Sequence, residues 1–159
     1  MAFKTADLYD EHVDKVQVCT LDFRSYGGKK RFSGKIETVD VFEDNVLVKE
    51  TLETAAEGSV VVINGGGSRN CALLGDRLAG IALSRGIEGI IIHGCVRDSV
   101  ELAKMDIGVL AIGTTPRRSK KNRLGEKGVK LFFGDVKWLP GDYVYADEDG
   151  VIISKEPLI

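Results

Sequence analysis

The sequence predicts an α/β protein with two halves, one built on a parallel sheet and one rich in β-strands. Short apolar segments alternate with helical segments through the middle of the chain, which is typical of βαβ units and a parallel sheet. After residue 129 the apolar segments become shorter and are separated by turn residues, which favours β-structure. The 159 residues contain no linker, repeat or low-complexity segment, so we expect one compact domain over residues 1–159.

The N-terminal part is expected to hold a short helix and a long strand. Thr5 has the residue type of an N-cap, and the helix that follows it should turn three side chains inward: Ala6, Leu8 and Tyr9. Aromatic and β-branched residues identify Arg31–Val41 as an extended strand.

The middle of the chain should alternate between strands and helices. The expected strands are Ser59–Ile63, Gly89–Ile92 and Ile107–Ile112. The expected helices are one capped by Asp44 or Asn45 that ends at Ala55–Gly58, one over Cys71–Arg85 closed by Gly86, and a short one from about Asp98 to Met105.

The C-terminal part begins with a polar, basic segment, Thr114–Gly128, which we expect to be a long loop. Four short strands should follow: Val129–Phe133, Val136–Leu139, Asp142–Tyr145 and Val151–Ser154. Asp149-Gly150 is a hairpin turn signal between the last two strands.

Composition excludes several classes of protein. The net charge of −2 gives no reason to expect direct nucleic-acid or membrane binding, and the apolar runs are too short to span a bilayer. Three cysteines without a CxxC spacing argue against a disulfide framework or a zinc site and favour a reducing compartment. The N-terminus has no apolar segment of a secretory signal, so we expect a cytoplasmic protein.

Two glycine-containing turns follow the central strands and lead into helices. The first strand is followed by Gly65–Ser68 and, further on, by Gly75–Leu78. The second is followed by Gly94 and then by Arg97-Asp98, with Glu101 one helical turn later. Because ligands of open α/β sheets bind at the carboxyl ends of the strands, these turns are the candidate site.

The residues of these turns suit chemistry on a pyruvate-like 2-oxo acid. Asp98 can hold Mg²⁺ or Mn²⁺, and the Arg97 guanidinium suits a carboxylate or an enolate oxygen. Backbone amides of Gly75–Leu78 can bind the substrate carboxylate if a helix begins there. Asp76 or Glu101 can act in proton transfer, which completes the requirements for cleavage of a C–C bond next to a carbonyl.

Each of these residues also has a purely structural interpretation. An Arg-Asp pair that begins a helix is commonly an N-cap beside a salt bridge, and an aspartate on a helix is commonly just solvated. Gly65–Ser68 is as often a packing turn as an anion site, and it lacks the patterns of nucleotide-binding loops.

The combination is more specific than its parts. Asp76, twenty further residues and then Arg97-Asp98 match the D-x20-R-D signature of the class II 4-hydroxy-4-methyl-2-oxoglutarate aldolases, which are grouped with the RraA family, the regulators of ribonuclease E activity. Further blocks make the chain similar to this family over nearly its whole length: residues 42–45, 65–69, 106–108, 145–147 and 149–150.

The resemblance implies a swivelling β/β/α fold and a homotrimer or hexamer with active sites between subunits. It also implies divalent-metal-dependent cleavage to two pyruvates, with oxaloacetate decarboxylation as a second activity. Asp98 would be the metal ligand, Arg97 the substrate and enolate binder, and Asp76 the holder of a metal-bound water. The loop of Gly75, Asp76, Arg77 and Leu78 would bind substrate, and Glu101 fits an acidic position seen three residues after the Arg-Asp pair.

Two features set this chain apart within the family. Larger aldolases add an acidic group to the neighbouring site from a C-terminal extension, and because this sequence stops at Ile159 we expect that group to be absent or replaced. Relatives that inhibit ribonuclease E can lack the aspartate at position 98; its presence favours the enzyme, with regulation of a ribonuclease E-type partner as the alternative. A menaquinone methyltransferase, the older label of some relatives, gains no support from Gly65–Ser68.

Four other features have mainly structural interpretations. His93 at a strand end is more often structural than catalytic, and Cys95 has no partners for a nucleophile. The basic run 117–123 is expected to be a solvated loop, with an acidic partner or RNA as the less favoured interpretation. Trp138 is expected in the core or an interface.

Overall fold

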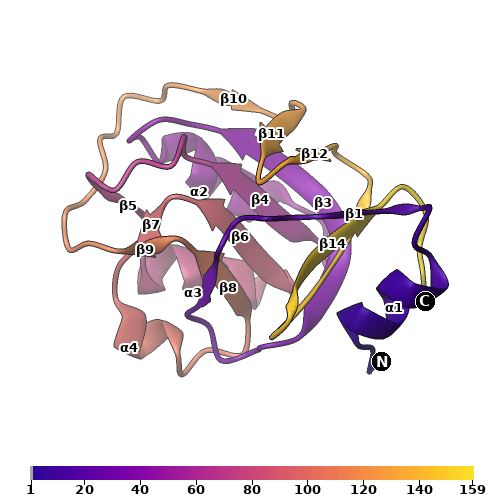
Figure 1. Ribbon diagram of the computed structural model, residues 1–159. Coiled ribbons are helices and arrows are strands. Elements are labelled where there is room, and N and C mark those ends of the chain that lie inside the picture. The colour runs from indigo at the N-terminus through magenta and orange to yellow at the C-terminus, as the bar shows by residue number, and fades with distance from the viewer. Residues whose placement is uncertain (1) are drawn as a thin grey trace.

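The computed structural model describes residues 2–159, and a sheet of nine strands forms its centre (Figure 1). The parallel part of this sheet contains, in spatial order, β3 (Phe32–Asp40), β4 (Val60–Asn64), β6 (Gly89–His93) and β8 (Gly108–Ala111). The other strands are antiparallel to their neighbours: β1 (Val16–Val18), β2 (Arg24–Ser25), β10 (Glu126–Lys127), β13 (Tyr143–Asp147) and β14 (Gly150–Ser154). The predicted α/β class is therefore confirmed.

The parallel strands are apolar on both faces because both faces are covered. On β4, Val61 and Ile63 face one core cluster, while Val60 and Val62 face the other, and all four are fully buried. Successive side chains of a strand point to opposite faces, so a continuous apolar run marks a strand between two layers.

Helices form the layer on the first face. These are α2 (Val46–Thr54), α3 (Asp76–Ser84) and α4 (Ser99–Leu102). Leu52, Ala82 and Leu102 are buried in the same cluster as the strand residues that face them. The helices are held by this apolar stripe, as in other short amphipathic helices.

A second β layer covers the other face. It contains the antiparallel pair β11 (Leu131–Phe133) and β12 (Val136–Trp138) together with side chains of β13 and β14. Trp138 is fully buried, and its indole N–H donates to the carbonyl of Phe133 at 3.1 Å, which confirms it as a core residue. The order helix, sheet and second β layer agrees with the expected β/β/α arrangement.

A small parallel sheet extends the fold at one end. It contains β5 (Ala72–Leu74), β7 (Cys95–Val96) and β9 (Gly113–Thr114). Figure 1 shows this sheet at the end of the molecule opposite α1 (Thr5–Glu11), beside which both chain ends lie. The small sheet brings together the segments that follow β4, β6 and β8.

The predicted helix over Cys71–Arg85 is wrong in its first part. Ala72–Leu74 form β5, and α3 begins only at Asp76, after Gly75 as its N-cap. The apolar residues of this segment have a spacing that fits a helix, but their backbone pairs with β7, and this pairing is not visible in the local sequence. The helix ends as expected, since Gly86 has a positive φ of 75° after Arg85.

Other differences are smaller. Thr5 is the first helical residue rather than the N-cap, and its hydroxyl donates to Asp147 at 2.6 Å. Leu8 is buried as expected, but Ala6 and Tyr9 are exposed because one face of α1 alone contacts the sheet. The helix at Asp98 is shorter than predicted, the loop over 114–128 contains β10, and β1 and β2 were not predicted.

Two further observations concern the whole described chain. Within residues 2–159 there is no helix with the length and apolar composition needed to cross a bilayer. Cys19, Cys71 and Cys95 are buried free thiols, and burial raises the pKa of each.

Candidate functional site

A cavity of about 560 Å³ lies where α2, α3 and the start of α4 meet the segment that follows β9. Its size is in the range of small-molecule sites. Its lining residues come from segments far apart in the sequence: Asn45, Val46, Lys49, Ala72, Leu74, Gly75, Asp76, Arg77, Leu78, Arg97, Asp98, Arg118, Ser119 and Lys121.

The turn between β5 and α3 contacts the Arg97-Asp98 pair directly. A Cβ atom at Gly75 would lie 2.5 Å from Asp98 Oδ2 and 3.3 Å from Arg97 Cγ, so any other residue here would displace the Asp98 carboxylate. The backbone N–H of Asp76 donates to Asp98 Oδ2 at 3.0 Å. The twenty-residue spacing of the sequence motif therefore corresponds to a contact between two strand-end turns.

Backbone geometry fixes the position of Asp98. It is the N-cap of α4 and has φ of 60° and ψ of 42°, the left-handed conformation that costs a non-glycine residue about 1–3 kcal/mol. The carbonyl of Asp98 accepts from Leu102 N–H at 2.9 Å, which ties the strained residue to the helix. Strain of this kind is often found at functional sites.

Arg97 is held at two points. Its backbone N–H donates to the Leu74 carbonyl at 2.9 Å, and its Nη1 donates to the Pro116 carbonyl at 3.3 Å. The guanidinium is exposed and keeps four further N–H donors for a ligand, because a guanidinium carries five. Arg97 can thus bind an oxyanion without losing its attachment to the fold.

The two carboxyl groups of Asp76 and Asp98 influence each other. The pKa of Asp76 is raised, first by its hydrogen bond with Asp98, then by desolvation, and then by the negative charges of Asp98 and Glu101. Two carboxylates in contact are stabilised by a shared proton or by a cation between them.

These carboxylates also fit a divalent cation. Within residues 2–159 no group of three or more His, Cys, Asp or Glu side chains has the arrangement of a complete metal cage. Mg²⁺ and Mn²⁺ do not require one, since they bind through one or two carboxylates and keep several waters. The contact of Asp98 with Asp76 at an open cavity suits this mode of binding, with Asp98 as the anchor.

Six of the seven predicted site residues line the cavity; Glu101 does not. It is exposed on α4 and acts on the site only through its charge, which contributes to the raised pKa of Asp76. Leu78 is buried beneath the cavity, whereas Asp76 and Arg77 are exposed in its wall. The candidate site is therefore assembled, with Glu101 at its margin.

The sequence prediction missed one wall of the cavity. Arg118, Ser119 and Lys121 lie in the basic run that was expected to be a solvated loop, and Lys49 faces them from α2. The run is exposed except for Ser119, but its backbone is anchored, because a bridge joins Arg118 to Ala72 of β5. The density of positive charge was the signal that could have linked this loop to an anionic ligand.

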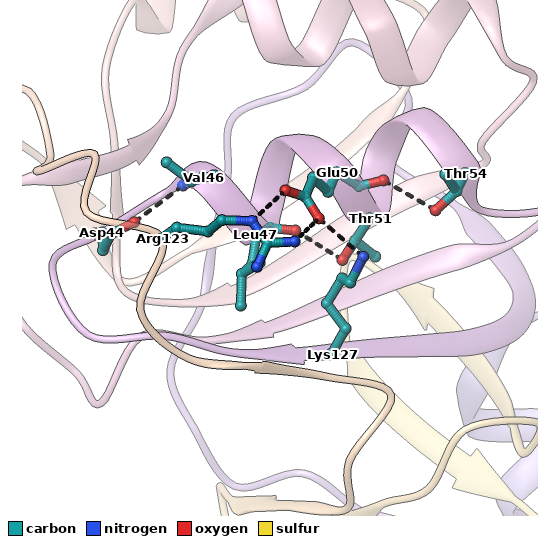
Figure 2. A network of polar contacts seen from close by, with 8 residues as sticks. All are labelled: Asp44, Val46, Leu47, Glu50, Thr51, Thr54, Arg123 and Lys127. Atoms are coloured by element: carbon teal, nitrogen blue, oxygen red, sulfur yellow. Dashed lines mark hydrogen bonds and ion pairs between the residues drawn. The ribbon is translucent and has the colours of Figure 1, made fainter.

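Figure 2 shows how the end of the basic run is fastened to α2. Arg123 donates two hydrogen bonds to Glu50, at 3.0 and 2.9 Å, and Lys127 donates a third at 3.0 Å. These contacts lower the pKa of Glu50, with the Lys127 hydrogen bond as the largest cause. Asp44 Oδ1 accepts from Val46 N–H at 3.1 Å and caps the first turn of α2.

The turn Gly65–Ser68 has no donors left for a ligand. The amides of Gly65 and Gly67 both donate to the His93 carbonyl at 3.0 Å, and that of Gly66 donates to Asn64 Oδ1 at 3.0 Å. The Ser68 amide donates to the Gly65 carbonyl at 3.3 Å. The packing interpretation of this turn is the one that the structure supports.

His93 and Cys95 also have structural roles. The His93 ring stacks on Phe133 with a centroid separation of 4.9 Å, its Nδ1 lies 3.1 Å from Asn64 Oδ1, and burial lowers its pKa. Cys95 is buried, with a raised thiol pKa, which disfavours the thiolate that a nucleophile needs. Neither residue lines the cavity.

Comparison with known proteins gives one consistent family and several different names. The profile of the RraA-like family, described as Aldolase/RraA, matches residues 5–153. A protein of Bacillus cereus with the provisional name 4-hydroxy-4-methyl-2-oxoglutarate aldolase is 56% identical over 156 residues, which are 98% of each chain.

Two solved structures are similar over almost the whole chain. One, from Geobacillus kaustophilus, is described as S-adenosylmethionine:2-dimethylmenaquinone methyltransferase; it is 61% identical, with a TM-score of 0.97 and coverage of 98% of this chain and 97% of that one. The other, from Thermus thermophilis, is described as the RNA-processing inhibitor RraA; it is 43% identical, with a TM-score of 0.95 and coverage of 99% and 95%. Names within one fold therefore differ, and the chemistry of the site has to decide between them.

Proposed function

Because the chain belongs to the RraA-like family, we propose that it is a carbon–carbon lyase that cleaves 4-hydroxy-4-methyl-2-oxoglutarate into two molecules of pyruvate. The observation that carries this proposal is the contact of the Gly75-Asp76 turn with Arg97-Asp98 in the wall of one cavity. It places a guanidinium, two carboxyl groups and the beginning of a helix around one small volume.

The substrate carboxylate binds at the beginning of α3 in this proposal. The first turn of a helix has backbone N–H groups without partners in the helix, and its dipole favours an anion. Arg97 binds the 2-oxo oxygen, where negative charge develops as the C3–C4 bond breaks and the electron pair forms the enolate of pyruvate.

Proton transfer involves Asp76. The proton of the 4-hydroxyl group leaves as that oxygen becomes the carbonyl of the first pyruvate, and C3 of the enolate is protonated to give the second. Asp76 lines the cavity, and its raised pKa makes its carboxylate a better proton acceptor than an ordinary aspartate, which suits it for this exchange.

Asp98 would hold Mg²⁺ or Mn²⁺, which when bound supplies Lewis-acid polarisation of the 2-oxo acid. The strained position of the half-buried Asp98 at the cavity wall supports this role. Decarboxylation of oxaloacetate is a second reaction of the same site, since it also leaves the electron pair in an enolate of pyruvate that Arg97 stabilises.

The test is pyruvate release from 4-hydroxy-4-methyl-2-oxoglutarate and from oxaloacetate, with and without Mg²⁺ or Mn²⁺. The wild type should turn over only with metal, and Asp98→Ala should fall to the background of metal alone. Asp10→Ala, an exposed aspartate on α1 far from the cavity, is the matched control and should keep full activity. Turnover unchanged in Asp98→Ala would refute the proposal.

We also propose that the active form is a homotrimer or hexamer with sites near subunit boundaries. Large apolar side chains are exposed on the single chain, among them Phe42, Val100, Leu124 and Phe132, and the site itself is open. Light scattering coupled to the activity assay should give a multiple of three times 17.3 kDa for the active species. Fully active monomers would contradict this.

A second candidate function is inhibition of a ribonuclease E-type enzyme. It is favoured by the similarity to the RNA-processing inhibitor RraA of Thermus thermophilis. Binding of the purified chain to such a ribonuclease should be measurable by interferometry and should weaken when exposed Arg117 is changed to Glu. No binding at micromolar concentration would exclude it, whatever the outcome of the lyase assay.

A further inference from the structure

The lining of the cavity is strongly cationic beyond Arg97 itself. Among all residues that line the cavity, five carry a positive charge and two carry a carboxylate. Arg77 and Arg97 are sequence neighbours of the two carboxylates. The other three cations, Lys49, Arg118 and Lys121, come from α2 and from the segment that follows β9, and we call them the cationic wall together with Ser119.

The cations of this wall have no carboxylate of their own. No ion pair within 4.0 Å involves Lys49, Arg118 or Lys121 anywhere in residues 2–159. The nearby Glu50 is already bound to Arg123 and Lys127, as Figure 2 shows. The buried Asp44 accepts from the backbone amides of Val46 and Asn122. The positive charges of Lys49, Arg118 and Lys121 are therefore available to a ligand in the cavity.

Ser119 gives independent evidence for a ligand. The residue lines the cavity and is only 6% exposed, yet its Oγ is one of two buried side-chain oxygens in the described chain without a hydrogen-bond partner. A buried hydroxyl without a partner costs about 1–3 kcal/mol. A ligand acceptor in the cavity would remove this cost.

The wall is held in place by α2. Lys121 donates to Asn45 Oδ1 at 2.9 Å, and Asn45 Nδ2 donates to the Leu73 carbonyl at 3.3 Å. Asn45 is also the N-cap of α2, so the positive end of that nine-residue helix faces the same wall. The position of Lys121 is thus fixed relative to both the helix and β5.

We propose that the cationic wall binds the second carboxylate of a dicarboxylic 2-oxo acid, the one that is distant from the bond-breaking end. Arg118 and Lys121 supply charge, Ser119 donates a hydrogen bond, and Lys49 adds charge from α2. This subsite rests on the proposed lyase function for the identity of the substrate, and it makes Arg118, Ser119 and Lys121 determinants of specificity for dicarboxylates over monocarboxylates.

The test uses two ligands that differ only in this carboxylate. 2-Oxoglutarate has the five-carbon dicarboxylic backbone of the proposed substrate but lacks the 4-methyl group and the 4-hydroxyl group that cleavage needs. 2-Oxopentanoate has the same backbone length with a methyl group in place of the distal carboxylate. Calorimetric titration of the whole protein with Mg²⁺ present should give affinity at least about tenfold higher for 2-oxoglutarate, since charge-assisted hydrogen bonds are worth about 1.5–3 kcal/mol.

Variants then identify the wall. The affinity for 2-oxoglutarate should fall about three- to tenfold in each of three variants: Arg118→Gln, Lys121→Gln and Ser119→Ala. The affinity of each variant for 2-oxopentanoate should stay within about twofold of the wild type. Lys130→Gln, an exposed lysine outside the cavity, should change neither affinity. If the chain turns over its substrate, Arg118→Gln should raise KM more than it lowers kcat.

The outcomes separate this inference from the proposed function. Equal affinity of the wild type for the two ligands, no binding of 2-oxoglutarate, or equal weakening of both ligands by the variants overturns the subsite. If the protein prefers 2-oxoglutarate but releases no pyruvate from 4-hydroxy-4-methyl-2-oxoglutarate or oxaloacetate, the subsite stands and the lyase function is refuted.

Discussion

Two glycine-containing turns follow neighbouring segments of this fold, and they differ in what their backbone donors do. In Gly65–Ser68 each of the four amides donates within the protein, two of them to His93. In the turn at Gly75 the Asp76 amide donates to Asp98, and the first turn of α3 opens onto the cavity. Glycine is present in both turns, so glycine alone does not identify a ligand site; the turn at Gly75 differs because it lines the cavity.

In both turns an added methyl group would lie too close to other atoms, but those atoms differ. At Gly65 an added Cβ would lie 2.6 Å from Leu73 Cδ1 and 2.9 Å from the His93 carbonyl oxygen, which belong to the core and to the sheet. At Gly75 it would lie close to the carboxylate of Asp98 and to Cγ of Arg97, the two side chains that we propose for the reaction. The same substitution in the two turns should therefore separate activity from stability.

Gly75→Ala should have the largest effect, on activity. The new methyl group displaces the Asp98 carboxylate and Arg97, and a misplacement of about 1 Å at a reacting centre can cost about 10²-fold in rate. The free energy of unfolding should change by less than about 1 kcal/mol, because the Asp98 carboxylate can move away. Steady-state kinetics and urea unfolding measure the two effects.

Normal activity in Gly75→Ala would remove the turn from the active site. A fall in both activity and stability would mean that the turn is a packing element like Gly65–Ser68.

Gly65→Ala should have the opposite effect. The methyl group overpacks Leu73 and the backbone of β6, so the free energy of unfolding should fall by about 1–3 kcal/mol. The activity of the folded fraction, and its affinity for 2-oxoglutarate, should stay within about threefold of the wild type, since no ligand donor is lost. Urea unfolding measures the change in stability. Steady-state kinetics and ligand titration, both at a temperature 20 °C below the thermal unfolding midpoint of the variant, measure activity and affinity.

The comparison would fail if Gly65→Ala abolished ligand binding in protein that is still folded. In that case the first turn would also belong to the site.

The smallest of these effects is expected in Asp98→Asn, on the pKa of Asp76. With the charge of Asp98 removed, the pKa of Asp76 should fall from its raised value towards that of an ordinary aspartate. Carboxyl-carbon NMR of metal-free protein measures this. Because the wild-type pKa is raised on folding, the native state binds the proton more tightly, and this pair makes stability decrease as pH rises between the unfolded and the folded pKa.

Asp98→Asn should flatten this part of the stability profile, while Asp10→Asn should leave it unchanged. An unchanged pKa of Asp76 in Asp98→Asn would mean that the two carboxyl groups do not interact in solution.

Much of the fold was predictable because its determinants are local. The apolar runs of β4 and β6 and the turn residue Gly86 each act within a few positions, and periodicity identifies them. The wrong prediction of a helix at β5 has a non-local cause. Ala72–Leu74 become a strand because Cys95–Val96 offer a partner more than twenty residues away, and propensity does not contain that information.

The candidate site divides in the same way. The contact of Gly75-Asp76 with Arg97-Asp98 could be anticipated because the spacing of the motif reflects two turns that follow paired strands, β5 and β7. Arg118, Ser119 and Lys121 were not found, since a polar loop has no periodicity that shows where it docks. Its place is set by distant partners, among them Asn45 for Lys121 and Glu50 for Arg123.

The central claim is that ligand chemistry belongs to the turn at Gly75 and not to the turn at Gly65. A crystal structure of the protein grown with Mg²⁺ and pyruvate tests it most directly. We predict the cation on the Asp98 carboxylate, and pyruvate between Arg97 and the backbone amides at the start of α3. Pyruvate bound at Gly65–Ser68, or a cation site that does not include Asp98, would contradict the account.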